Sequence, residues 1–113
     1  MKIIDAPISL DDLKAMAQSG FGNLVKAVVD VEREIMAVDG ELHADEEALL
    51  LENGSFQKSL WGINIYPDME GPDRIEFDSL INIRPSQGNR SRGVDNSMIR
   101  DKILQIVNKL ITS

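Results

Sequence analysis

Apolar residues occupy nearly every second position from Leu24 to Val38, which predicts a β-strand with one buried face. The apolar positions are Val25, Ala27, Val29, Val31, Ile35 and Ala37. The other face holds Lys26, Asp30, Glu32 and Glu34, so we expect it to contact solvent. Arg33 interrupts the alternation and predicts a bulge or a bend. Asp39-Gly40 follows and predicts a hairpin turn, because type I′ turns need residues that tolerate positive φ.

Three further segments have the pattern or the boundaries of strands: 2–5, 60–66 and 74–84. In the second, the residues on one side are Trp61, Ile63 and Ile65; in the third they are Ile75, Phe77, Ile81 and Ile83. Prolines follow all three segments, at Pro7, Pro67 and Pro85. Proline cannot donate a hydrogen bond to a neighbouring strand, so each proline predicts the end of a strand.

Helical spacing of apolar residues appears near both ends of the chain. Near the N-terminus the stripe is Leu10, Leu13, Met16 and Ala17; near the C-terminus it is Ile99, Ile103, Ile106, Val107 and Leu110. Ser9 is the expected N-cap of the first helix, and Asp95 or Asn96 that of the second. We therefore predict one amphipathic helix near each end.

The segment from Glu41 to Glu52 fits two structures. As a strand it places Leu42, Ala44, Ala48 and Leu50 on one face. As a helix it begins near Asp45 and consists of good helix formers. The strand is favoured, because a hairpin turn at Asp39-Gly40 needs a second strand to pair with the first.

The resulting order of elements is strand, helix, four strands, helix, which predicts a single α+β domain over residues 1–113. We expect a two-layer sandwich with a mainly antiparallel sheet of four to five strands. The N-terminal and C-terminal helices are expected on one face of this sheet.

The composition is that of a soluble globular protein, with 42% hydrophobic and 27% charged residues. The absence of cysteine excludes disulfides, thiol nucleophiles and thiolate metal sites. No apolar run has the length of a signal peptide or a membrane span, so we predict a cytoplasmic protein with no membrane partner. The formal net charge of −7 disfavours nucleic acid as a partner, because phosphate backbones are bound by surplus Lys and Arg. No cofactor is predicted, and a homo-oligomer paired through an edge strand is compatible with the sequence.

The loop from Arg84 to Arg92 is cationic although the protein is acidic. It contains Arg84, Arg90 and Arg92, with no acidic residue between them. Guanidinium groups match phosphate and carboxylate, and the helix that follows directs free N–H groups toward the same region. We predict that the loop binds an anionic small molecule or an acidic partner surface through Arg84, Gln87, Asn89, Arg90 and Arg92. The alternative is that the arginines pair with the protein's own carboxylates, and Asp95 is placed to occupy the helix end.

A second hypothesis makes the protein a small metal-assisted hydrolase, so whether it is an enzyme stays open. Its ligands would be Asp30, Glu32, His43 and Asp45. Oxygen ligands with one imidazole suit Mn²⁺ or Zn²⁺, and His43 is also a candidate general base. Against this, alternating acids are more often a solvated sheet face, and no nucleophile elbow, phosphate-binding loop or HExxH motif occurs.

Two segments carry a resemblance to a known family. Residues 60–68 read LWGINIYPD, and residues 81–92 read INIRPSQGNRSR. Together they resemble a small prokaryotic family known only as a domain of unknown function, and the likeness extends over nearly the whole chain. The resemblance implies a prokaryotic cytosolic protein with no assigned reaction, and it supplies no catalytic residue.

Overall fold

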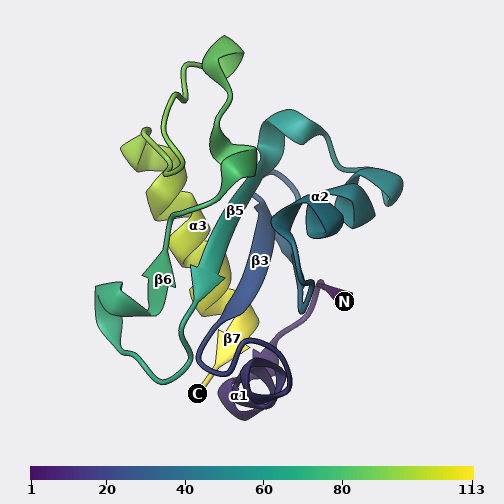
Figure 1. Cartoon of the computed structure of the whole chain (residues 1–113), viewed down its shortest axis with the longest axis vertical. Coiled ribbons are helices and arrows are strands. Elements are labelled where there is room, and N and C mark those ends of the chain that lie inside the picture. The colour runs from purple at the N-terminus through teal and green to yellow at the C-terminus, as the bar shows by residue number, and fades with distance from the viewer.

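The computed structural model describes all 113 residues and contains a five-stranded sheet with three helices (Figure 1). The strand order is β1 (Lys2–Ile4), β4 (Ile35–Val38), β3 (Val25–Asp30), β5 (Leu60–Ile65) and β6 (Ile75–Glu76), and all neighbours are antiparallel. The helices are α1 (Leu10–Ser19), α2 (His43–Glu52) and α3 (Ser97–Leu110). β2 (Ile8–Ser9) and β7 (Ile111–Thr112) form a small parallel sheet. The predicted α+β class with an antiparallel sheet is confirmed.

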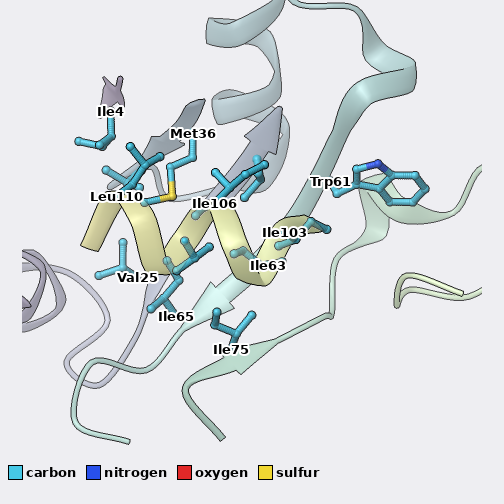
Figure 2. Packing of buried hydrophobic residues seen from close by; sticks show 14 of the residues in the cluster. Ile4, Val25, Met36, Trp61, Ile63, Ile65, Ile75, Ile103, Ile106 and Leu110 are labelled. Atoms are coloured by element: carbon cyan, nitrogen blue, oxygen red, sulfur yellow. The ribbon is translucent and has the colours of Figure 1, made fainter. Parts of the chain in front are cut away.

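The larger apolar cluster lies between one face of the sheet and α3 (Figure 2). The central strands contribute Val25, Ala27, Val29, Ile63 and Ile65; α3 contributes Ile103, Ile106, Val107 and Leu110; α1 contributes Leu13 and Ala17. Each aliphatic side chain buried here stabilises the fold by roughly 1.5–3 kcal/mol. The caps are those expected from the sequence, since Ser9 accepts a hydrogen bond at the start of α1 and Asn96 does so at the start of α3. None of the three helices has the length and apolar sequence needed to cross a bilayer.

α2 covers the opposite face of the sheet, so helices lie on both sides (Figure 1). A smaller apolar cluster joins it to the strands and consists of Val28, Ala37, Leu50 and Leu60. The strand favoured for residues 41–52 is therefore wrong, and two layers do not describe a sheet that is covered on both faces. Asp39 has the positive φ of a turn residue, at 67°, but the chain turns there into a helix. The helix is favoured because it buries Leu50 against Val28 of β3 and Leu60 of β5.

The strand predicted from Leu24 to Val38 is two strands joined by a tight turn. β3 ends at Asp30 and β4 begins at Ile35, and these two residues are paired. The Asp30 carboxylate accepts hydrogen bonds from the backbone N–H groups of Glu32 and Arg33, at 3.0 and 2.9 Å. The interruption that the sequence showed at Arg33 is thus the reversal of a hairpin.

β6 ends at Glu76, although the alternation predicted a strand from Arg74 to Arg84. Beyond β6, the side chain of Asn82 takes the place of a strand. Its Oδ1 accepts from the Gly62 N–H at 2.8 Å, and its Nδ2 donates to the Gly62 carbonyl at 2.9 Å. This close approach needs glycine in β5, because a Cβ at Gly62 would lie 2.6 Å from the Ser79 side chain.

Replacing Gly62 with alanine is expected to lower the free energy of unfolding by about 2 kcal/mol, because the added methyl group overpacks a buried contact. Gly93→Ala is the matched control, since a Cβ there would meet its nearest atom, the Phe77 carbonyl oxygen, at 3.4 Å. Urea denaturation of both variants measures the difference. Equal stability of the two would mean that residues 79–82 shift without cost.

Candidate functional site

Arg84, the first residue of the predicted anion site, is an internal side chain. It is only 8% exposed, and its guanidinium group donates to the carbonyls of Gln57, at 2.5 Å, and Leu60. The same group lies over the ring of Trp61, with 4.2 Å between the guanidinium carbon and the ring centroid. Nη1 and Nη2 therefore tie this loop to the start of β5, while Nε is buried without a hydrogen-bond partner.

Gln87 and Asn89 hold the loop in shape. Gln87 accepts a hydrogen bond from Arg84 at 3.3 Å and donates to the Lys58 carbonyl at 3.2 Å. Asn89 is buried, and its amide nitrogen donates to three carbonyls, those of Asn82, Ser91 and Gly93. Its Oδ1 accepts from the Asp95 N–H at 2.8 Å. Such a densely bonded side chain fixes backbone geometry and has little capacity left for a ligand.

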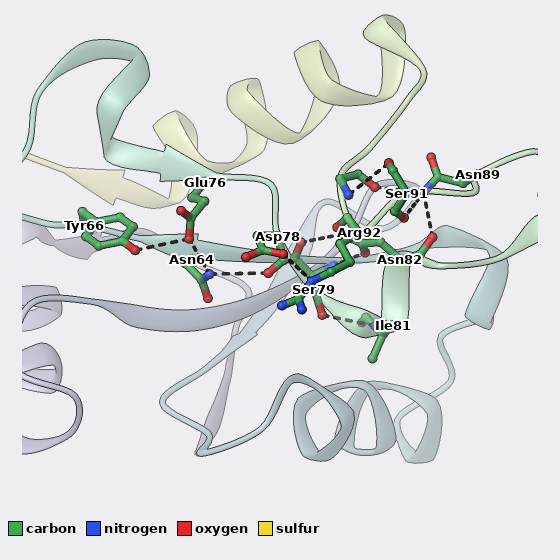
Figure 3. Close-up of polar contacts among 12 residues, drawn as sticks. Asn64, Tyr66, Glu76, Asp78, Ser79, Ile81, Asn82, Asn89, Ser91 and Arg92 are labelled. Carbon is green, nitrogen blue, oxygen red and sulfur yellow. Dashed lines mark hydrogen bonds and ion pairs between the residues drawn. The ribbon is translucent and has the colours of Figure 1, made fainter.

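The other two loop arginines have different environments. Arg92 forms an ion pair with Asp78, with 2.6 Å between Nε and Oδ1 (Figure 3). The Arg90 side chain is exposed and makes no hydrogen bond or ion pair. Asp95 accepts from the Ser91 hydroxyl and the Arg90 backbone N–H, and these hydrogen bonds lower the pKa of its carboxyl group. The loop does not gather three guanidinium groups around one point.

The residues of the metal hypothesis are also dispersed. Asp30 is buried at the hairpin turn, where it accepts from Ser55 Oγ at 2.7 Å, and Glu32 accepts from Ser59 Oγ at 3.1 Å. His43 and Asp45 lie in the first turn of α2. No three His, Asp or Glu side chains of the chain are placed to share a metal ion. The side chains of the metal hypothesis therefore do not form one site.

A row of polar residues crosses the sheet on the face that α2 covers. Lys26 of β3 lies opposite Asn64 of β5, which lies opposite Glu76 of β6. Lys26 shares the parity of Val28 along β3, and Asn64 shares that of Leu60 along β5, so these side chains lie on one face of the sheet. Val28 and Leu60 pack under α2 on that face. The apolar part of this face is under the helix, and its polar part lies at the start of the helix.

A pocket of about 330 Å³ lies at the start of α2, against this polar row. The polar residues that line it include Lys26, His43, Asn64, Asp78 and Arg92, and Leu42 and Ala44 at the start of α2 line it as well. Lys26 forms no ion pair, whereas Arg92 is paired with Asp78. Of the five residues predicted in the cationic loop, Arg92 is the one that lines this pocket.

The first turn of α2 adds unused donors to the same pocket. Its N-cap, Leu42, has no side chain that can accept a hydrogen bond. The backbone N–H groups of His43 and Ala44 consequently have no acceptor within the protein. Free N–H groups and the positive end of the helix dipole favour an anion at this position.

His43 is held as a neutral imidazole at the wall of the pocket. Its Nε2 is 2.8 Å from the Ile63 carbonyl oxygen, which can only accept, so Nε2 carries the hydrogen. Burial lowers the pKa of His43, and the positive charge of Lys26 also acts in that direction. Nδ1 is therefore a hydrogen-bond acceptor near neutral pH.

Asn64 is oriented by acidic and carbonyl partners. Its Nδ2 donates to Glu76 Oε1 at 2.8 Å and to the Asp78 carbonyl at 3.4 Å (Figure 3). Asn64 is only 8% exposed, and its Oδ1 has no hydrogen-bond partner. A buried acceptor without a donor costs roughly 1–3 kcal/mol, so it marks a place where a donor would be favoured.

Sequence reasoning missed Lys26 and Asn64 as site residues. Lys26 was assigned to a solvated strand face, and Asn64 to a strand without functional role. One signal was present, because Lys26 is the single cation among the acids of that face. The register that places Lys26 opposite Asn64 depends on two strands far apart in the sequence and leaves no local pattern.

No curated protein and no solved structure matches the chain. One known family, described as "Protein of unknown function (DUF5674)", matches residues 2–110. The expected relation to an uncharacterised family is confirmed, while prokaryotic origin stays a prediction. Since the match covers almost the entire sequence, the chain belongs to this family of proteins of unknown function.

Proposed function

We propose that the protein is a non-catalytic binding module that holds an anionic small molecule in the pocket at the start of α2. The observation that carries this proposal is Lys26, a half-buried cation without an ion pair, in the same pocket as two unused N–H groups of the helix. A partly buried cation and a helix N-terminus both favour negative charge, and their effects add where they meet. A volume of about 330 Å³ is within the range of small-ligand pockets.

Within the cationic loop, we assign the direct ligand contact to Arg92. A guanidinium group has five N–H donors, so Arg92 can contact an anion while it stays paired with Asp78. Arg84, Gln87 and Asn89 serve the site by fixing the loop that carries Arg92. Arg90, exposed and unpaired, is the loop residue left for the alternative of an acidic partner surface.

The test is a titration of ¹⁵N-labelled protein with methyl phosphate, followed by backbone amide shifts. We expect the amides of His43 and Ala44 to move, because their N–H groups would donate to the phosphate oxygens. Lys26→Gln should weaken binding about tenfold, which corresponds to about 1.4 kcal/mol. Arg90→Gln is the matched control and should change the affinity less than twofold.

Two results would contradict the proposal. An absence of shifts at millimolar methyl phosphate would reject an anion site in this pocket. Weaker binding in Arg90→Gln, with unchanged binding in Lys26→Gln, would place the anion site at the exposed part of the loop.

A further inference from the structure

A second pocket, with five apolar residues in its lining, lies beside the proposed anion site. Its volume is about 520 Å³, and its apolar walls are Met16, Phe21, Leu24, Val25 and Leu42. Two of these side chains are unusually exposed for their size, since Phe21 is 50% and Leu42 is 56% accessible to solvent. Large apolar side chains that surround a hollow mark a place where apolar ligand surface can be buried.

The two pockets meet at shared residues. Lys26 and Leu42 line both of them. The ammonium group of Lys26 also lies 5.2 Å from the centre of the Phe21 ring, so the aromatic wall begins next to the proposed anion contact. A ligand whose charged group is held by Lys26 therefore has apolar surface within reach on the other side of the same side chain.

The lining of the larger pocket also includes two acidic residues. Asp39 and Glu41 line it as well. Carboxylates repel a second negative charge, so this pocket selects against ligands that are anionic at both ends.

We infer that the ligand is a bipartite molecule, with one anionic group bound by Lys26 and the start of α2 and an uncharged apolar or aromatic group bound against Phe21 and Leu42. This inference rests on the proposed function, because it extends the ligand from the anion site into the neighbouring pocket. The chemical class is an aryl or alkyl phosphate or carboxylate.

The experiment compares phenyl phosphate with methyl phosphate, which have the same charged group. Calorimetric titration is expected to give at least tenfold tighter binding of phenyl phosphate. Phenyl phosphate alone should shift the amides of Phe21 and Gly40, which line the second pocket but not the proposed anion site. Phe21→Ala should reduce the preference for phenyl phosphate below threefold, whereas Phe56→Ala should retain it, because Phe56 is exposed and lines neither pocket.

The outcomes separate this inference from the proposed function. Equal affinities for the two esters, with shifts at His43 and Ala44, would overturn the bipartite ligand and leave the anion site intact. A preference for phenyl phosphate that survives Phe21→Ala would also overturn it. Failure of both esters to bind would overturn the proposed function together with this inference.

Discussion

Replacing Arg84 with alanine is expected to lower the free energy of unfolding by about 3 kcal/mol. The substitution leaves the carbonyls of Gln57 and Leu60 without their donor, and it uncovers one face of Trp61. Hydrogen bonds from a charged donor are worth roughly 1.5–3 kcal/mol each, and a cation over an aromatic ring about 1 kcal/mol more. The cost of burying the guanidinium group, which also lowers the pKa of Arg84, offsets part of this sum.

Urea denaturation followed by tryptophan fluorescence measures the effect directly, because Trp61 is the only tryptophan in the chain. The emission of the folded variant should also shift to longer wavelength as water reaches the ring. Arg84→Lys should restore less than half of the loss, since an ammonium group cannot donate in two fixed directions from one plane. Arg90→Ala is the control and should change stability by less than about 0.5 kcal/mol, and an equal loss there would refute the assigned role of Arg84.

Arg84 also shows why the binding site could be predicted only in part. The sequence reveals a guanidinium group in an acidic protein, but it does not reveal two carbonyl oxygens from residues 57 and 60 that need donors. Those acceptors are more than twenty residues away in the sequence. Arg92 lines a pocket because the loop is fixed around Asn89, and this bonding also depends on contacts beyond the local pattern.

The fold could be predicted where residues close together in the sequence determine an element. Ser9 and Asn96 cap helices through bonds to residues two or three positions ahead, and β5 follows from the alternation around Trp61. The prediction failed where a distant group decides the structure. The strand expected after Glu76 ends because the side chain of Asn82 completes the pairing of β5.

α2 is a further case, because it contains a buried carboxyl group that no sequence pattern indicates. Glu46 is fully buried, and its Oε2 accepts from the Gly40 N–H at 3.0 Å, while its Oε1 has no partner. Burial raises the pKa of Glu46 to about 9, and the hydrogen bond from Gly40 offsets only part of that effect. The folded protein therefore holds Glu46 in its neutral form at pH 7.

Stability is expected to fall as the pH rises, because Glu46 is ionised in the unfolded chain above its ordinary pKa of 4.5 and neutral in the folded chain up to about 9. Unfolding releases a proton throughout this range, so the free energy of unfolding falls by about 1.4 kcal/mol for each pH unit. The contribution of neutral Glu46 to stability is fully present below pH 4.5 and is lost as the pH approaches 9. Glu47 acts in the same direction, since burial raises its pKa as well.

Comparison with Glu46→Gln isolates the contribution of Glu46 to the pH dependence of stability. The amide keeps an oxygen that can accept from Gly40 but has no proton to lose, so the wild-type protein should lose about 2 kcal/mol more than the variant between pH 7 and 8.5. Urea denaturation at both pH values measures this difference, in a range above the titration of the buried His43. Glu52→Gln, at the exposed end of the same helix, should keep the wild-type pH dependence. If Glu46→Gln and the wild type lost stability in parallel, Glu46 would be ionised in the folded state, and water would have to reach its carboxylate beneath α2.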